Sequence, residues 1–296
     1  MNILITGSTG FIGRNLIKRI ISDGHTVFTI IRNTTNRDIL KSEKIDYIDS
    51  ERMDQIIDYF SEKKIDGIIH LASCFISEHQ SHEIDDLFNT NLLFSTKILE
   101  AAVRQKVKWF LNTGTFWQHF NNEKYSPVNL YSATKQAFEV VARYYTELYD
   151  INFVTLKLSD TYGPNDNRNK IMNLLIKAMK TGEKLEMSGG GQQLDITYID
   201  DVVNAYSIMT KIVIEDNNRT FLNKSFAVSS MNPIRLKSLV EIFSKVTKKQ
   251  LNIEWGVKPY RKREVMTPWN TGEILPGWKP LVNLEEGILK MIRENK

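Results

Sequence analysis

The chain of 296 residues is 42% hydrophobic and 25% charged, and its 39 basic and 35 acidic residues leave a net charge of +4. This composition is ordinary for a globular protein, and the charges form no block of like sign that would indicate a nucleic-acid-binding tail. The single cysteine, Cys74, excludes an internal disulfide, and no run reaches the ~18 apolar residues of a membrane span, so we expect a cytoplasmic protein without nucleic-acid or membrane partners.

Strand-like apolar runs alternate with helix-like segments through the first half of the chain. The predicted strands cover residues 2–6, 26–31, 66–71, 109–112 and 153–158. The predicted helices cover residues 11–22, 91–104 and 132–149. Alternation of this kind predicts the α/β fold class, as a doubly wound parallel sheet of the Rossmann type with helices on both faces.

The regular alternation stops after residues 163–164, which are Gly-Pro. Short strands mix there with three predicted helices, over residues 171–181, 236–246 and 284–293. We predict an NAD(P)-binding Rossmann domain over residues 1–164, which also receives later segments. Residues 165–296 should form mainly a smaller α/β substrate-binding region. No low-complexity linker separates the two parts, so they should pack tightly.

A glycine-rich turn lies between the first predicted strand and the first predicted helix. A dinucleotide site needs such a turn, because free N–H groups at the helix start face the pyrophosphate and a side chain would block its approach. Glycines that merely punctuate a turn are the alternative, but the strand before and the helix after favour the nucleotide site. We expect cofactor contacts from Gly7, Thr9, Gly10, Phe11, Ile12 and Gly13.

The end of the second predicted strand bears on the choice of cofactor. NAD sites place an acid there for the ribose 2′-hydroxyl, whereas NADP sites use an arginine for the 2′-phosphate. Arg32 stands at this position without an acid, and Arg14 adds a second positive charge near the glycines. We therefore expect NADP, with NAD second, and the alternative is that Arg32 is a solvated loop residue.

Tyr131 and Lys135 are spaced i, i+4 at the start of a long predicted helix, so both project from one face. A lysine ammonium one turn away favours the phenolate and lowers the pKa of a tyrosine, which makes it a usable acid–base group. Thr115 follows a predicted strand, where its hydroxyl could hold a substrate oxygen. These three residues are the predicted catalytic set.

The order of these motifs, with residues 70–73, Asn91 and residues 162–164, resembles the extended short-chain dehydrogenase/reductase family. That family includes the NAD-dependent epimerases and dehydratases of nucleotide sugars. The resemblance implies that Tyr131 is the general acid/base, that Lys135 binds the nicotinamide ribose, and that Thr115 orients the substrate oxygen. It also implies further cofactor contacts, at Asp49 for the adenine and at Leu71, Ala72, Ser73 and Asn91 along the cofactor path.

Within that family the chain is similar to the CDP-sugar 4-reductases that make paratose and abequose. Residues 110–115, 253–256 and 277–279 carry this likeness, as does Arg261 with Glu264. The resemblance implies substrate contacts from Asp160, Asn173 and Arg261, with Arg261 at the diphosphate. It also implies a homodimer through the helices 91–104 and 132–149, and a place in the synthesis of surface-polysaccharide sugars.

Two features depart from the pattern of the family. Leu194 stands where the family usually has an arginine before the acid, here Asp195. Residues 116–120 are unusually aromatic, and they could stack on a substrate or fill the core.

The predicted function is NADPH-dependent reduction of a 4-keto nucleotide sugar. The alternatives are a nucleotide-sugar epimerase with a tightly bound cofactor and a non-catalytic NADP-binding sensor. The residues after Thr115 are Phe116 and Trp117 instead of the acid pair of the dehydratases, so dehydration is disfavoured. We find no cluster with metal-ligand spacing, and His70 should be a structural residue of the sheet.

Overall fold

Seven parallel strands form the central sheet of the protein, for which the computed structural model describes residues 1–35, 38 and 45–294. Their spatial order is β3-β2-β1-β4-β5-β6-β11. The strands are β1 (Asn2–Thr6), β2 (Thr26–Ile31), β3 (Asp46–Asp49), β4 (Gly67–His70), β5 (Trp109–Thr115), β6 (Asn152–Leu158) and β11 (Ser225–Val228). The chain grows outward from β1 in one direction and then from β4 in the other, which confirms the predicted doubly wound α/β fold.

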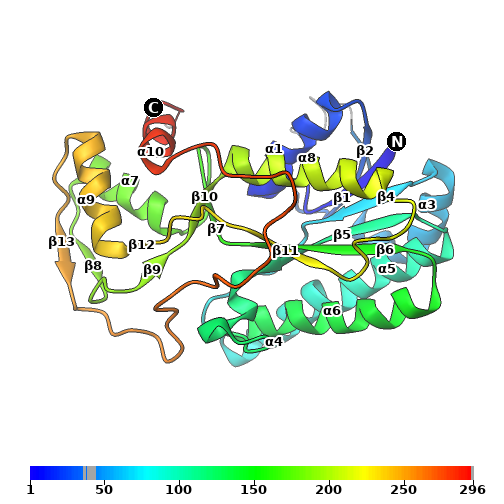
Figure 1. Cartoon of the computed structure of the whole chain (residues 1–296), viewed down its shortest axis with the longest axis horizontal. Coiled ribbons are helices and arrows are strands. Elements are labelled where there is room, and N and C mark those ends of the chain that lie inside the picture. Colours follow the sequence, from blue (N-terminus) through cyan, green and yellow to red (C-terminus); the bar gives the residue numbers. More distant parts are fainter. Residues whose placement is uncertain (36–37, 39–44, 295–296) are drawn as a thin grey trace.

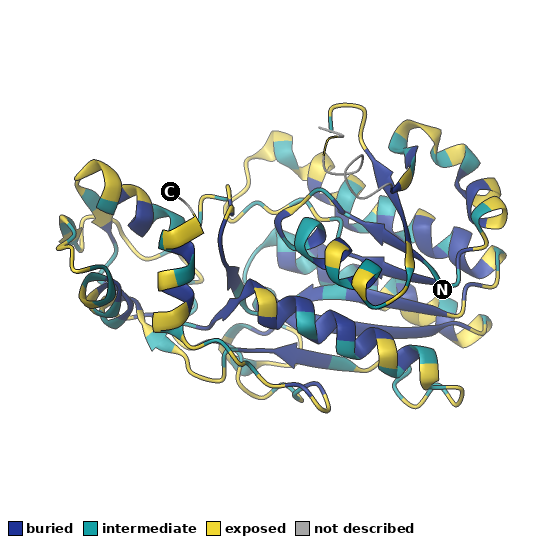
Figure 2. Cartoon of the chain, turned by 90° about the horizontal axis from the view of Figure 1, so that it is seen from above, coloured by how far each residue is buried: buried dark blue, intermediate teal, exposed yellow. Residues whose placement is uncertain are grey.

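Helices cover both faces of this sheet (Figure 1). One face carries α1 (Phe11–Ser22) and α8 (Ile199–Glu215), and the other carries α3 (Ile56–Lys63), α5 (Ser95–Arg104) and α6 (Leu130–Leu148). Successive residues of a strand point to opposite faces, so Ile3 and Ile5 pack with the α1 and α8 side while Leu4 packs with the other. The strands are therefore buried on both sides, as Figure 2 shows.

Several short helices lie in the connections that follow the strands. They are η1 (Ser50–Gln55), η2 (Ser81–Glu83), α4 (Ile84–Phe88), η3 (Asn89–Phe94), η4 (Phe116–Gln118) and η5 (Phe120–Asn122). The predicted helix 91–104 is thus α5 preceded by a π-helical turn, η3. The homodimer expected through α5 and α6 stays a prediction.

The pattern of the sequence missed the 17-residue helix α8. Ten of its residues are buried, over more than half of its circumference, because α8 lies between the sheet, α1 and the C-terminal region. Its exposed residues, which include Asp200, Lys211 and Glu215, form only a narrow polar stripe, so the apolar residues lie too close together in the sequence to show the pattern of a surface helix. Together with β11, α8 brings chain from beyond residue 164 into the Rossmann layers.

Small elements beside the sheet make up the rest of the chain. The helices are α7 (Ile171–Thr181), α9 (Leu236–Thr247) and α10 (Leu284–Glu294). Three strand pairs accompany them: β7 (Asp160–Tyr162) with β10 (Ile196–Tyr198), β8 (Leu185–Met187) with β13 (Ile253–Trp255), and β9 (Gln193–Leu194) with β12 (Ile234–Arg235). Buried side chains of α7 and α9 belong to the same apolar cluster as Ile3 and Ile5 of β1, so this region shares a core with one face of the sheet.

Residues 256–283 return from β13 to the sheet without forming a helix or strand (Figure 1). Asp201 of α8 anchors their last part, because its carboxylate accepts the backbone N–H groups of Leu281 and Val282 at 2.9 and 3.0 Å. The Trp278 indole donates to the Asp201 carbonyl at 2.9 Å. In the described part of the chain, no helix is long and apolar enough to cross a membrane.

Candidate active site

A cavity of about 740 Å³ opens at the carboxyl edge of the sheet, where doubly wound folds bind their ligands. Its walls come from the turn between β1 and α1, the loop after β4, the end of β5, the first turns of α6 and residues 261–269. Of the predicted site residues, those that line it are Gly7, Gly10, Phe11, Ile12, Gly13, Leu71, Ser73, Thr115, Tyr131, Lys135, Asp160 and Arg261. The structure therefore brings the glycine turn, the predicted catalytic set and the predicted substrate cation to one place.

The glycine turn has the shape that a dinucleotide requires. Gly7 has a φ of +68°, and a Cβ there would lie 2.7 Å from the backbone nitrogen of Ala72. A Cβ on Gly13 would lie 2.3 Å from the Gly7 carbonyl oxygen, so the helix could not pack against the turn. Helix α1 starts at Phe11 with no side-chain cap, which leaves its first N–H groups available for a pyrophosphate. These residues fit a dinucleotide cofactor.

Asn91 acts on the loop that follows β4. It is buried in the π-helical turn η3, and its side chain pairs with both backbone groups of Cys74, at 2.8 and 2.9 Å. This contact fixes the loop whose residues Leu71 and Ser73 face the cavity. Asn91 itself does not line the cavity, and neither do four other predicted cofactor residues of the described chain, Thr9, Arg32, Asp49 and Ala72.

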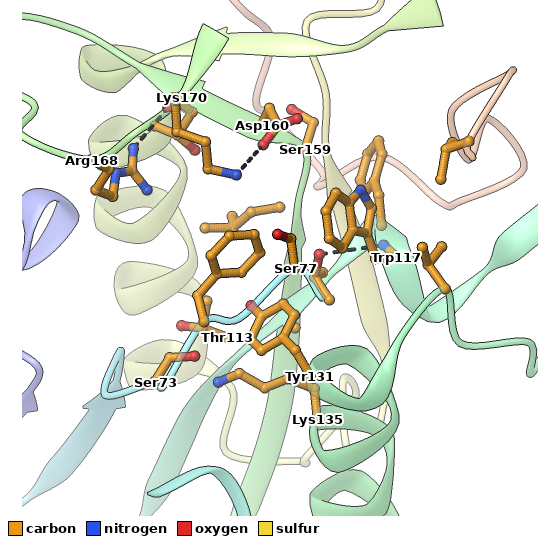
Figure 3. Close-up of a pocket in the computed structure, with 18 of the residues that line it drawn as sticks. Ser73, Ser77, Thr113, Trp117, Tyr131, Lys135, Ser159, Asp160, Arg168 and Lys170 are labelled. Carbon is orange, nitrogen blue, oxygen red and sulfur yellow. Dashed lines mark hydrogen bonds and ion pairs between the residues drawn. The ribbon is translucent and has the colours of Figure 1, made fainter. Parts of the chain in front are cut away.

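Helix α6 projects Tyr131 and Lys135 into the cavity, toward Ser73 (Figure 3). The helix begins at Leu130 because Asn129 and Ser132 form a capping box, in which the Asn129 side chain accepts the Ser132 N–H at 3.0 Å. The amide of Asn129 also donates to the carbonyl of Ser77 at 2.9 Å. The capping residue thus joins the first turn of α6 to the loop after β4.

Burial sets the protonation states of Tyr131 and Lys135. Desolvation raises the pKa of Tyr131 to about 12, against a hydrogen bond from Ser73 that lowers it. Desolvation lowers the pKa of Lys135 to about 8, and the carboxylate of Glu139 one turn later opposes this shift. At neutral pH Tyr131 therefore carries its proton and Lys135 is mostly charged.

Thr115 ends β5 at the same edge of the sheet, and it lines the cavity. Its hydroxyl oxygen accepts the N–H of Trp117 at 3.3 Å and so caps η4. Two residues earlier, the Thr113 hydroxyl bonds to the buried Tyr206 phenol at 2.6 Å. Thr115 thus keeps a weakly engaged hydroxyl beside the helix that carries Tyr131.

The aromatic segment after Thr115 is shared between the core and the wall of the cavity. Phe116 is buried and packs edge-on against Trp269 at 5.1 Å, as a core residue would. Trp117 lines the cavity and lies 5.6 Å from the ring of Phe75. Phe75, which is 44% exposed, meets Tyr131 edge-on at 5.0 Å. Phe75 and Trp117 therefore form an aromatic wall, and the phenol ring of Tyr131 lies against it at Phe75.

Positive charges line the opposite side of the cavity (Figure 3). Lys170 pairs with Asp160 at 2.7 Å and lies 4.3 Å from the ring centre of Phe75. Arg261 pairs with Glu264 through two contacts of 3.1 and 3.2 Å.

Arg168 also faces this side, and its backbone carbonyl accepts the side chain of Asn173 at 2.8 Å. Asn173 therefore supports the segment before α7 and does not line the cavity. Leu194 does line it, so no guanidinium stands at that position.

Sequence reasoning missed Arg168, Lys170, Phe75 and Trp269 as lining residues. The two cations follow β7 within the polar run 165–170, which comes directly after the Gly-Pro pair that ends the strand. Their position directly after a short strand was the sequence signal that could have indicated both cations as lining residues. Trp269 lies in the irregular segment 256–283, where no periodic pattern could place it.

His70, expected to be structural, is buried in β4, where its ring nitrogens bond to Thr6 and Ser95 at 2.8 Å each. Among residues 1–35, 38 and 45–294, no group of three or more His, Cys, Asp or Glu side chains could hold a metal ion.

Known proteins resemble the chain along almost its whole length. The model of the NAD dependent epimerase/dehydratase family matches residues 3–221. CDP-abequose synthase of Salmonella muenchen is 29% identical over 293 residues, which cover 98% of this chain and 96% of that protein. The probable UDP-glucuronate 4-epimerase of Rhizobium meliloti is 26% identical, with 99% and 96% covered. The solved structure of MoeE5 in complex with UDP-glucuronic acid and NAD has a TM-score of 0.84 at 20% identity, covering 99% of this chain and 98% of its own.

The expectation of NADP, with NAD second, is wrong. The matching family is described as NAD dependent, and the similar solved structures with a named cofactor contain NAD. The error came from Arg32, which is exposed at the end of β2 and does not line the cavity. Water solvates an exposed guanidinium well without any phosphate, so this residue type at one strand end does not select the cofactor.

Proposed function

The chain belongs to the NAD-dependent epimerase/dehydratase family, and we propose from this premise that it reduces the 4-keto group of a nucleotide sugar with NADH. The observation that carries the proposal is the meeting, in one cavity, of a dinucleotide turn, the Tyr131–Lys135 pair and a cationic wall. A nucleotide sugar has an anionic diphosphate and a polar ring, which suit the cationic wall and the catalytic edge respectively.

Bound NADH supplies the hydride for the sugar carbon, and the glycine turn from Gly7 to Gly13 would hold its pyrophosphate. The chain supplies the proton. Because the pKa of Tyr131 is raised to about 12, the phenol is protonated at neutral pH and can donate to the sugar oxygen. Thr115 would hold the same oxygen through its hydroxyl. The ammonium of Lys135 would stabilise the phenolate that remains and bind the ribose of the cofactor.

The cationic wall would bind the diphosphate of the substrate. Arg261 offers a planar fork suited to phosphate oxygens, and Lys170 and Arg168 add charge from the segment after β7. Asp160, which holds Lys170, lies on the same side and would accept a sugar hydroxyl. Lys170 and Arg168 would thus supply charge that Leu194, which stands at the family's arginine position, cannot supply.

Reduction is favoured over the related reactions by two observations. Phe116 and Trp117 follow Thr115, so the position offers no carboxylate for removing water. CDP-abequose synthases match the chain over 90% or more of its length at 26–29% identity. Epimerisation is the second candidate, because a probable UDP-glucuronate 4-epimerase matches over a similar length.

Cofactor stoichiometry separates the two candidates. The protein is mixed with NADH and a 4-keto-6-deoxy sugar carried on CDP, dTDP, UDP or GDP, and NADH absorbance is followed. A reductase consumes one NADH for each sugar reduced. Conversion of UDP-glucuronate or UDP-glucose to its 4-epimer without net loss of NADH would replace reduction by epimerisation. A folded protein that binds NADH but converts none of these sugars would refute both.

A further inference from the structure

A buried polar network lies behind Trp269, which lines the cavity, and the proposed chemistry does not use this network. Lys157 of β6 is 3% exposed. Its Nζ donates to Nε2 of His119 at 2.9 Å and lies 3.4 Å from a carboxylate oxygen of Glu139. An unpaired ammonium in such a place would cost several kcal/mol, so these two partners are what keep Lys157 inside the protein.

Gln118 extends the network to Thr115. Its carbonyl oxygen accepts the backbone N–H of Thr115 at 2.9 Å. Its amide nitrogen donates to Gln136 and Glu139 of α6, at 2.8 Å each. Gly114 leaves the room for this arrangement, since a Cβ there would lie 2.7 Å from the Gln118 oxygen and 2.9 Å from Lys157. The network therefore ties the end of β5 to the helix that carries Tyr131 and Lys135.

His119 carries the network to the cavity wall. Its Nδ1 lies 3.1 Å from the carbonyl of Glu123, which can only accept, so Nδ1 holds the hydrogen and Nε2 accepts from Lys157. Burial and the charge of Lys157 lower the pKa of His119 to about 4, which keeps the ring neutral. The ring stacks on Trp269 at 4.1 Å, with 14° between the planes, and Trp269 lines the cavity.

We propose that Lys157, Glu139 and His119 are positioning residues that hold Trp269 as a fixed wall of the sugar site. The network locks the His119 ring, and the locked ring fixes the plane of Trp269, against which the carbons of a sugar ring would pack. The inference rests on the proposed function, because it takes the cavity beside Trp269 as the site of the nucleotide sugar. A side chain that shifts by about 1 Å near reacting groups can lower turnover about a hundredfold.

The test compares Lys157→Met, Trp269→Leu and the double variant. Lys157→Met keeps the aliphatic stem and removes the charge, and Lys108→Met, at an exposed lysine before β5, is the matched control. CDP-glucose and UDP-glucose are the probes, titrated by calorimetry in the presence of NAD. We expect Lys157→Met and Trp269→Leu each to weaken the better probe at least tenfold. The double variant should be no worse than Trp269→Leu alone, because both changes remove one interaction.

NAD affinity should stay within twofold in all of these variants, and Lys157→Arg should restore most of the sugar affinity. If Lys157→Met does not fold, His119→Leu takes its place in the cycle, since it removes the stack and leaves the Lys157–Glu139 pair. Additive losses, or unchanged probe affinity in folded Lys157→Met or His119→Leu protein, would overturn the positioning role alone. A parent protein that binds NAD but neither these probes nor their dTDP- and GDP-linked counterparts would overturn the proposed function as well.

Discussion

The two sides of the cavity are built in different ways. Tyr131, Lys135 and Thr115 come from the capped start of a 19-residue helix and the end of a central strand, both held by buried neighbours. Arg261 and Trp269 come from residues 256–283, which have no regular hydrogen-bonding pattern of their own. The groups proposed to transfer the proton thus stand on regular elements, and the groups proposed to select the substrate stand on irregular chain, where substitutions can change specificity without disturbing the sheet.

The irregular side is nevertheless part of the same folded body. Leu239 of α9 and Leu275 of the irregular segment are buried in the apolar cluster that contains Ile3 and Ile5 of β1. Figure 2 shows the buried strands of the sheet and the exposed loops around this region. The two sides therefore share one core, and they differ in the regularity of their backbone.

Tyr131→Phe should have the largest effect, on the rigid side of the cavity. The substitution deletes only the phenolic oxygen, so the edge-on contact with Phe75 and the fold should survive. Loss of the proton donor should lower turnover by roughly two to four powers of ten, with the affinity for NADH and for the nucleotide sugar nearly unchanged. Single-turnover assays at several substrate concentrations measure the rate and the affinities, and a thermal melt checks that the variant is folded. A folded variant that keeps most of its turnover would contradict the assignment.

Leu239→Ala tests whether the two sides share one core. The side chain is fully buried, so its truncation should lower the free energy of unfolding by about 3 kcal/mol. Urea unfolding followed by tryptophan fluorescence and by circular dichroism should remain a single transition with one midpoint. Two separate transitions, of which only one moves in the variant, would break the shared-core interpretation.

Arg261→Ala should separate binding from chemistry. Loss of a charge-assisted contact should weaken the nucleotide sugar by about 2 kcal/mol, or about 30-fold, and leave NADH affinity unchanged. Lys262→Ala, at the exposed neighbour, is the control and should bind like the parent. An unchanged dissociation constant in Arg261→Ala would mean that the diphosphate lies elsewhere in the cavity.

The pH dependence of cofactor binding should show the smallest effect, at the rigid side. Burial lowers the pKa of Lys135 to about 8, so NADH affinity should fall above that pH, by about tenfold in all up to pH 10, or about 1.4 kcal/mol. Glu139 opposes the shift, and the neutral His70 lies near the same ammonium.

The stability of the folded protein should instead rise with pH over this range. The unfolded chain keeps Lys135 protonated up to about pH 10.5, so unfolding binds a proton between pH 8 and 10.5 and this group's contribution to stability rises across that window. Lys135→Met should abolish both dependences. Titrations and melts from pH 7 to 10 measure them, and a parent profile identical to that of Lys135→Met would refute the role of the lysine.

The sequence by itself determined the layers of the fold and the edge of the sheet at which the candidate site lies. Alternating apolar runs predicted the parallel strands, and the glycine turn and the i, i+4 pair Tyr131 and Lys135 were visible because each depends on a few adjacent residues. These features follow from local periodicity and short-range geometry, which one chain displays directly. The same reasoning failed for α8, which shows only a narrow polar stripe, and for the cofactor, because Arg32 is exposed and does not line the cavity.

Only the tertiary structure decided which distant segments complete the cavity. Trp269 stacks on His119 across 150 residues of sequence, and Lys170 reaches Phe75 across 95. It also packed Phe116 against Trp269 and left Trp117 beside Phe75, and it placed Asn91 where its side chain supports the loop after β4 and does not line the cavity. Contacts of this kind leave no periodic trace in the sequence, because they depend on where irregular chain crosses the carboxyl edge of the sheet once the core has packed.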